Sequence, residues 1–521
     1  MKSGRYGLNG VRRAGAENVS AHLDVAPQVK SVEIEKLLAS QLPPLKIAGA
    51  RALLRESLAQ AGATLVVLDD DPTGTQTVHG VTVLLQWSPD ILRDLLASKP
   101  TAFFLSTNSR ALGQAKAAAL NRQIGRLLRK AAGQTGRQLL IASRSDSTLR
   151  GHYPHETDAL AEGLGVQFDG QIIAPAFFDG GRYTVGDVHW VEQQGIATPV
   201  GETEFARDPS FGFVNSDLGR WVEEKTRGRY RAENVVSVSL KEIRTGGPGK
   251  VAEKLLGVKD GGPVVVNAAA DEDLEVFALG VAEAEKQGRR FLYRCAASLV
   301  KVRAGIDNHP LLTAEALQLN GRPGLVVAGS YVEKTSRQLT RLLATSGVCG
   351  VEIPVDNLLD PQRRDQEIHR VTGLAEKAVA EGTTPVVFTS RKRIACPGSE
   401  FLQAGEVVMA GLCQVVCNFA KPLGFVLAKG GITSHEVARA GLGIVRAEVM
   451  GQIHKGIPVW RTGPETRWPG IPYVIFPGNV GNEETLAHVV GMLKPNRESG
   501  ASVEPSPNVR RRSQNQRRDY D

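Results

Sequence analysis

Residues 66–77 read VVLDDDPTGTQT, an apolar run that ends in three carboxylates, a proline and a glycine. The apolar run favours a strand buried on both faces, and the proline and glycine after it favour a tight turn. The three aspartates are therefore predicted to lie at the carboxyl end of a buried strand. Because ligands bind outside this end of the strands in an open α/β sheet, the stretch predicts both a fold class and a candidate site.

Short apolar runs of the same kind recur along the chain, and helical patterns separate several of them. The further runs are VTVLL (81–85), TAFFL (101–105), LLIAS (139–143), QIIAPA (171–176), PVVVNAA (263–269), LVVAGS (325–330), TPVVFTS (384–390), GFVLAKGG (424–431) and YVIFPGN (473–479). Strands that alternate with helices are typical of a parallel sheet covered by helices. We predict two tandem α/β domains with mainly parallel sheets and an active site in the cleft between them.

Turn residues concentrate between residues 305 and 322, so the domain boundary is placed there. The predicted organisation is a partly disordered leader over residues 1–60, a first domain over 61–310, a second domain over 320–493, and a disordered basic tail over 494–521.

The net charge of +8 lies mainly at the two ends of the chain. Residues 1–60 carry +4 and residues 494–521 carry +3, which leaves +1 for the predicted domains. Nucleic acid is therefore not expected as the main partner. No apolar run approaches the ~20 residues that a membrane span needs, and the start of the chain lacks the apolar segment of a secretory signal. The five cysteines contain no CxxC pair, so we expect reduced thiols in a cytoplasmic protein.

Turns rich in glycine and hydroxyl groups follow three strands of the second domain. They are GSYVEKTSRQ (329–338), KGGITSHE (429–436) and FPGNVG (476–481). Gly430 and Gly431 would let the backbone approach a phosphate closely, and Thr433 and Ser434 add hydroxyls at a helix start. No segment matches the P-loop pattern GxxxxGK[ST]. The alternative is that GGITS is only a helix N-cap and a turn.

The segment RSDSTLRG (144–151) concentrates donors and acceptors after another strand. Arg144 and Arg150 could bind a carboxylate in bidentate geometry, and Asp146 or Ser147 could bind hydroxyl groups. Such a set suits a sugar acid. The alternative is a solvated loop with an internal Arg–Asp ion pair.

The acidic stretch also fits a second chemistry. Asp69-x-Asp71-x-Thr73 after VVL matches the haloacid-dehalogenase phosphatase signature, in which Asp69 would be phosphorylated and Asp71 would act as general acid. Ser106 or Thr107 would then be the second motif of that superfamily. This hypothesis assigns no function to residues 320–490. A purely structural turn and a non-catalytic binding protein are the remaining alternatives.

Taken together, the segments resemble the four-carbon acid sugar kinase family. The family motifs DDxTG, KxDSTLRG, PAFPxxGRxTxxGxHxV, RTAASFVxxxAGI, GSCSxxTxxQ, GGxTS and KPGNFGxxDAL are matched in order by residues 70–74, 144–151, 175–191, 293–306, 329–338, 430–434 and 476–486. The resemblance covers residues 62–493. It implies that the first domain binds a four-carbon sugar acid, that the second binds ATP, and that the product is a 4-phosphate of a tetronate or 3-oxo-tetronate.

The resemblance also assigns roles to residues and a magnesium ion to the reaction. Asp71, with Asp70, is expected to be catalytic, and Asp71 is the expected base. The substrate-binding set is Thr73, Arg144, Asp146, Ser147, Arg150 and Arg182. The nucleotide-binding set is Ser330, Thr335, Gly430, Gly431, Ile432, Thr433, Ser434, Gly478 and Asn479. No metal ligands are assigned, and a homodimer is left open as the assembly.

The chain departs from the family pattern at three places. Arg144 stands where the family has lysine, and arginine cannot act as a compact point charge. Phe476 replaces the lysine of KPGN, which removes a cation near the expected phosphates. Tyr331 and Val332 replace the Cys-Ser of GSCS. These changes bear on which acid the protein accepts.

Overall fold

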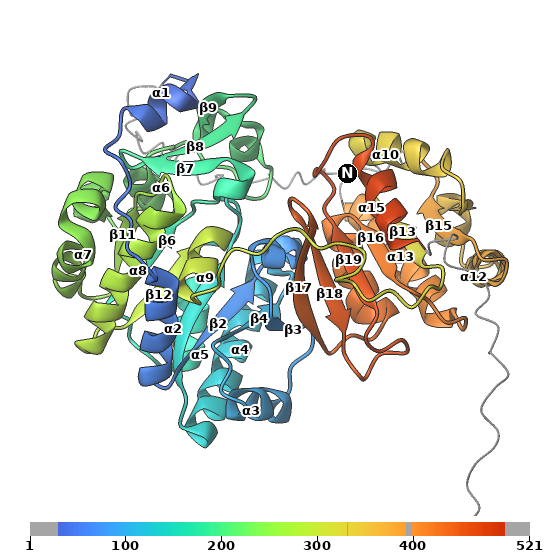
Figure 1. Cartoon of the computed structure of the whole chain (residues 1–521), viewed down its shortest axis with the longest axis horizontal. Coiled ribbons are helices and arrows are strands. Elements are labelled where there is room, and N and C mark those ends of the chain that lie inside the picture. The colour runs from blue at the N-terminus through green and yellow to red at the C-terminus, as the bar shows by residue number, and fades with distance from the viewer. Residues whose placement is uncertain (1–29, 331, 392–398, 495–521) are drawn as a thin grey trace, which may run out of the picture.

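The structure is a computed structural model that describes residues 30–330, 332–391 and 399–494. Figure 1 shows two α/β domains beside each other, the first coloured from blue to yellow-green and the second from yellow to red. The predicted fold class, two α/β domains with mainly parallel strands, is confirmed. Tyr331, one of the departures from the family pattern, lies outside the described residues, as does Cys396.

The first domain contains a parallel sheet in the order β10-β11-β6-β12-β5-β2-β4-β3. Its strands are β2 (Ala63–Asp69), β3 (Val81–Leu84), β4 (Ala102–Ser106), β5 (Gln138–Arg144), β6 (Gly170–Ala174), β10 (Val236–Val238), β11 (Gly262–Val266) and β12 (Phe291–Cys295). Every residue of β2 is buried, because helices cover both faces of a parallel sheet. This explains why the strand is an unbroken apolar run rather than an alternating one.

Helices cover this sheet, and a small antiparallel sheet lies at its top in Figure 1. The helices are α2 (Ala50–Gln60), α3 (Pro89–Ala97), α4 (Gln114–Thr135), α5 (His155–Leu164), α6 (Leu218–Lys225), α7 (Gly247–Leu256), α8 (Asp271–Lys286) and α9 (Ala297–Arg303). The small sheet has the order β1-β9-β8-β7 and comprises β1 (Val32–Glu33), β7 (Arg182–Val185), β8 (Val188–Gln193) and β9 (Ile196–Pro199), with α1 (Ile34–Ala39) after β1. Arg51 of α2 pairs with Asp271 and Glu275 of α8, which ties residues 50–60 to the domain.

The second domain has a parallel core extended by an antiparallel hairpin. The strands are β13 (Leu325–Ala328), β14 (Val348–Ile353), β15 (Thr384–Thr389), β16 (Val426–Lys429), β17 (Arg446–His454), β18 (Ile457–Thr462) and β19 (Pro472–Phe476). The helices are α10 (Glu333–Leu343), α11 (Val355–Leu359), α12 (Arg364–Ala380), α13 (Ser399–Asn418), α14 (Gly431–Glu436) and α15 (Thr485–Leu493).

The two sheets join edge to edge and form one sheet of fifteen described strands. β17 pairs antiparallel with β3, with Arg446 opposite Leu84 and Val449 opposite Val81. In Figure 1 the orange-red hairpin of β17 and β18 lies against the blue β3. The strand direction reverses three times, from β3 to β17, from β17 to β18 and from β18 to β19, so the parallel strands of the second domain run opposite to those of the first. The junction holds the two domains together at a fixed strand pair.

Candidate active site at the domain interface

The acidic stretch forms a compact turn at the end of β2. The 3-10 helix η1 (Pro72–Thr77) begins directly after Asp71, and Pro72 stands at its first position. Asp71 Oδ1 accepts hydrogen bonds from the backbone N–H of Thr73 at 2.8 Å and from its hydroxyl at 2.6 Å. Asp71 therefore acts as the N-cap of this turn, which is why an acid precedes the Pro-Thr-Gly segment. Its Oδ2 atom is left for other partners.

Asp69 lies beneath this turn rather than beside it. Its side chain is 1% exposed, and a methyl group placed on Gly74 would lie 1.9 Å from its Oδ2. Arg144 donates to Asp69 Oδ1 at 3.1 Å. Burial raises the pKa of Asp69 to about 7. The turn covers the carboxylate, so a substrate has no direct access to it.

Arg110 joins the acidic side chains of two segments. It donates to Asp70 Oδ1 at 2.6 Å, and its Nη1 lies 3.4 Å from Asp71 Oδ2 and 3.7 Å from Asp146 Oδ1. Burial alone would raise the pKa of Asp71 and of Asp146. The nearby guanidiniums outweigh this effect and hold both pKa values below the ordinary range of a carboxyl group. Sequence analysis missed Arg110, although it follows TAFFL in the polar segment STNSR, at the end of a strand like the other clusters.

The two arginines predicted from RSDSTLRG have different surroundings. Arg144 is buried and also lies 3.7 Å from Asp70 Oδ1, so it sits under the acidic turn. Arg150 donates to Asp146 Oδ2 at 2.7 Å, which is the internal ion pair considered as an alternative. The carbonyl of Ser147 accepts a hydrogen bond at 2.7 Å from His189.

Arg182 reaches this region from β7 of the small sheet. Its guanidinium lies 5.8 Å from the centre of the Phe205 ring, and the guanidinium of Arg150 lies 5.1 Å from the same ring. Its Nε atom is buried without a hydrogen-bond partner. The structure thus brings Asp70, Asp71, Asp146, Arg150 and Arg182 to one region of the first domain.

The predicted nucleotide residues gather at the ends of β13, β16 and β19. Gly430 has a φ of 113°, a conformation that side chains rarely adopt, and a methyl group there would lie 3.3 Å from Ser330 Cβ and from Thr433 Oγ1. Thr335 lies within 3.4 Å of the Ser330 hydroxyl. Ser434 points into the fold, where its hydroxyl donates to the carbonyl of Ala428. Ile432 exposes 58% of its surface.

The turn at Gly478 and Asn479 is held by two lysines that sequence analysis missed. Lys429 Nζ donates to the carbonyls of Pro477 at 2.6 Å and of Gly478 at 3.1 Å, and Lys334 donates to the carbonyl of Asn479 at 3.0 Å. Burial lowers the pKa of Lys429 to about 7.

Lys429 also bears on the departure at Phe476. The two residues are register partners on β16 and β19, and Lys429 Nζ lies 4.4 Å from the centre of the Phe476 ring. A lysine side chain is therefore present beside the PGN turn, but it comes from the neighbouring strand.

The two groups of residues meet across the domain interface. A methyl group placed on Gly431 would lie 3.8 Å from Asp71 Oδ2. Ser106 Oγ lies 3.4 Å from Nδ1 of His435 on α14, and Trp460 of β18 donates to the hydroxyl of Thr75 at 2.9 Å. The acidic turn and the glycine turn therefore face each other.

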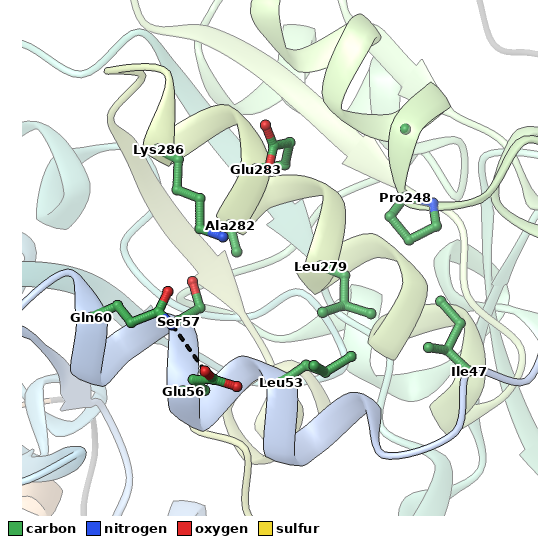
Figure 2. Close-up of a pocket in the computed structure, with 11 residues that line it drawn as sticks. Ile47, Leu53, Glu56, Ser57, Gln60, Pro248, Leu279, Ala282, Glu283 and Lys286 are labelled. Atoms are coloured by element: carbon green, nitrogen blue, oxygen red, sulfur yellow. Dashed lines mark hydrogen bonds between the residues drawn. The ribbon is translucent and has the colours of Figure 1, made fainter.

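Two pockets lie outside this region. Figure 2 shows one of about 460 Å³ between α2 and α8, where Leu53, Leu279 and Ala282 lie near the Glu56–Gln60 hydrogen bond. A second, of about 520 Å³, lies at the far end of η1, beside His79 and His309. Neither pocket is lined by Asp69, Asp70, Asp71 or Asp146.

Among residues 30–330, 332–391 and 399–494, no group of three or more His, Cys, Asp or Glu side chains is arranged to hold a metal ion. The described cysteines, Cys295, Cys349, Cys413 and Cys417, are free thiols. None of the helices in the described part of the chain is long and apolar enough to span a membrane.

Comparisons with known proteins agree with the two-part organisation. A family model described as a sugar-binding N-terminal domain matches residues 65–303, and one described as a nucleotide-binding C-terminal domain matches residues 325–486. A D-erythronate kinase of Heliobacterium modesticaldum is 27% identical over 324 residues, which cover 60% of this chain and 67% of that protein.

Solved structures share the fold. A Haemophilus influenzae protein of the DUF1537 family aligns with a TM-score of 0.56 at 19% identity and covers 82% of this chain and 100% of its own. A Salmonella typhimurium LT2 protein, provisionally described as a tRNA synthase, aligns with a TM-score of 0.59 at 15% identity and covers 81% of this chain and 98% of its own. At these identities the likeness concerns the fold alone.

Proposed function

Because this chain belongs to the four-carbon acid sugar kinase family and is a phosphotransferase that acts on an alcohol group, we propose that it transfers the terminal phosphoryl group of ATP to the 4-hydroxyl of a four-carbon sugar acid. Candidate acids are erythronate, threonate and 3-oxo-tetronates. The relative that is named a D-erythronate kinase favours erythronate as the first acid to try.

The observation that carries the proposal is the position of Asp71 opposite Gly431. Phosphoryl transfer consists mainly of positioning two substrates and neutralising charge. The reaction needs a carboxylate near the acceptor hydroxyl and a backbone that a phosphate can approach. Asp71 and the Gly430–Gly431 turn meet both needs from opposite domains.

Asp71 is proposed as the group that accepts the proton of the reacting hydroxyl. Arg110 and Arg144 lower its pKa, so the carboxylate is ionised at neutral pH. Its Oδ1 is held by Thr73, which leaves Oδ2 directed toward Gly431. Asp70 is engaged on both oxygens by Arg110, so it is proposed to position that arginine.

A magnesium ion fits these side chains. Mg²⁺ is usually held by one or two carboxylates together with substrate phosphates, which agrees with the lack of an all-protein cage in the described residues. Because the free Oδ2 of Asp71 is assigned to the proton, Asp70, if Arg110 moves, would be the protein ligand of the ion, and the bound ion would neutralise phosphate charge.

The phosphatase alternative is disfavoured by the surroundings of Asp69. A phosphorylated aspartate must be open to the substrate, but Gly74 and Arg144 enclose this carboxylate. A binding protein without turnover remains the second candidate. The free described thiols favour a cytoplasmic location, which we propose together with the kinase activity.

The test is a panel of four-carbon acids offered to the purified protein with magnesium and ATP. Release of ADP is expected only when an accepted acid is present, and the product should carry phosphate on its 4-oxygen. Thermal stabilisation by ATP without ADP release from any acid would support the binding protein instead. Phosphate release from a phosphoester without nucleotide, abolished by Asp69→Asn, would support the phosphatase.

A further inference from the structure

Two arginines of the acidic region have no carboxylate within ion-pair distance in the described part of the chain. Arg294 is 1% exposed, and its Nε and Nη1 atoms are buried without hydrogen-bond partners. The buried Nε of Arg182 is also unpartnered. By contrast, each of the other three arginines here, Arg110, Arg144 and Arg150, pairs with at least one aspartate.

Arg294 lies in β12, directly behind the sugar-acid segment. Its Nη2 donates to the carbonyl of Arg150 at 3.1 Å, and its guanidinium lies 5.1 Å from the centre of the Trp221 ring. A contact with an aromatic ring engages the face of a guanidinium and leaves the N–H groups at its edge for an acceptor. Buried N–H groups without an acceptor are costly, more so when they are charged. The arrangement therefore calls for an anionic partner.

Arg182 and Arg294 have electrostatic partners in common. Both lie within electrostatic range of Asp146 and of His189. His189 is itself anchored by the carbonyl of Ser147, inside the segment that carries Asp146. Glu192 and Glu204 influence Arg182 only from beyond ion-pair distance. Asp70 also attracts Arg294, more strongly than Asp146 does. The two unpaired guanidiniums thus lie beside the aspartates of the acidic region.

The acidic region also borders the domain interface. Starting at Gly431, contacts run to Asp71 Oδ2, then to Arg110, and then to Asp146. Arg110 Nη1 lies 3.4 Å from Asp71 Oδ2 and 3.7 Å from Asp146 Oδ1. The two carboxylates therefore lie on either side of one nitrogen atom. A small acid whose hydroxyl lies at Asp71 would therefore have its carboxylate in the region that Asp146 shares with the two unpaired arginines.

We propose that Arg182, which is partly exposed, binds the carboxylate of the substrate with the buried Arg294 behind it, so that the acid lies with this group at the arginines and its reacting hydroxyl at Asp71. The inference rests on the proposed kinase function and adds a specificity determinant to it. Selection for an acid over the matching neutral polyol would come from these two side chains. Arg150 and Arg144, which already pair with aspartates, would shape the site instead.

The test compares Arg294→Gln and Arg182→Gln with the wild-type protein, using an accepted acid and the tetritol with the same hydroxyl pattern. Titration calorimetry measures both affinities, and steady-state assays measure kcat and KM. We expect each variant to bind the acid more weakly, on the order of 10- to 100-fold for the loss of one charge-assisted contact. Affinity for the tetritol, and KM for ATP, should change by less than about threefold. Arg294→Lys should recover part of the affinity for the acid.

Arg229→Gln, which removes a positive charge that pairs with Asp158 at a half-exposed site, is the matched control. Unchanged affinity for the acid in both arginine variants, or equal losses for acid and tetritol, would overturn the inference in favour of a structural role. If Arg294→Gln does not fold, Arg182→Gln decides alone. A wild-type protein that phosphorylates no acid contradicts the proposed function, whereas wild-type turnover with unaffected variants contradicts only the carboxylate site.

Discussion

Asp71 and Gly431 come from different domains, and yet a methyl group on Gly431 would lie 3.8 Å from Asp71 Oδ2. This distance is an ordinary van der Waals contact, so the two turns meet without a side chain between them. The carboxylate can approach an acceptor hydroxyl while the glycine backbone approaches a phosphate. The adjacent glycines of this turn have different constraints, which allows stability and catalysis to be tested separately.

Gly431→Ala and Gly430→Ala form a matched pair. Gly431 has an ordinary φ and free space around its Cα, so its alanine variant should melt close to the wild type. The added methyl group would occupy the space expected for phosphate, so KM for ATP should rise at least tenfold. Gly430 has a φ of 113°, so its alanine variant should lose about 1–3 kcal/mol. Calorimetric melting and steady-state kinetics separate the two effects. Normal kinetics in Gly431→Ala would show that the phosphate of ATP does not bind at this turn.

Asp71→Asn is expected to lower kcat by about 10²–10⁴-fold, the usual contribution of a positioned proton acceptor. Asparagine can still accept the Thr73 hydrogen bonds, so the melting temperature should change little. Because Arg110 and Arg144 lower the pKa of Asp71, the wild-type kcat should show no loss from this group as pH falls from 8 to 5. Asp69→Asn is the control, and its kcat should fall far less. A larger loss in Asp69→Asn than in Asp71→Asn would assign the chemistry to the buried carboxylate.

Lys429 should give stability a characteristic pH dependence. Burial lowers its pKa from an ordinary value of 10.5 to about 7, so between these values the unfolded chain binds a proton that the folded protein lacks. The free energy of unfolding is therefore expected to rise as pH increases from 7 toward 10. Lys429→Met should flatten this rise, whereas Lys421→Met, at an exposed lysine, should not. Denaturant melts at several pH values make the measurement, and parallel curves for wild type and Lys429→Met would contradict it.

The parts of the site that the sequence predicts are local. Asp71 and Gly430 each stand directly after an apolar strand, and a strand end followed by a turn is visible within ten residues. Arg110 had the same signal, since it follows a strand in a polar segment. Arg294 and Lys429 had a weaker one, a single charge in or at the end of an apolar strand, which marks a buried cation but not its partner.

The meeting of the two turns could not be predicted in the same way. It depends on the pairing of β3 with β17, which are more than 350 residues apart, and on a hairpin that reverses the strand direction. It also depends on the close packing of η1 against the second domain, where Trp460 reaches Thr75. Nothing in either segment alone specifies these contacts, because they depend on the packing of distant parts of the chain.

Trp460 provides the last prediction, because it connects the second domain to the turn that carries Asp71. Both Trp460 and Thr75 are buried, and the indole N–H donates to the Thr75 hydroxyl at 2.9 Å. Trp460→Phe removes this donor and part of the packing, so it should cost about 1–3 kcal/mol and lower the melting temperature by several degrees. Because η1 would be held less firmly, kcat should also fall, with little change in KM for the acid.

Thr75→Val keeps the shape of the side chain and removes the acceptor, which makes it the partner variant for a double-mutant cycle. If the hydrogen bond is the coupling between the domains at this point, the double variant should be little less stable than Trp460→Phe alone, with an interaction energy of about 0.5–3 kcal/mol. Strict additivity of the two losses would mean that Trp460 stabilises the interface through packing only. In that case the loss of kcat should appear in Trp460→Phe but not in Thr75→Val, and the position of Asp71 would depend on the shape of the interface rather than on this bond.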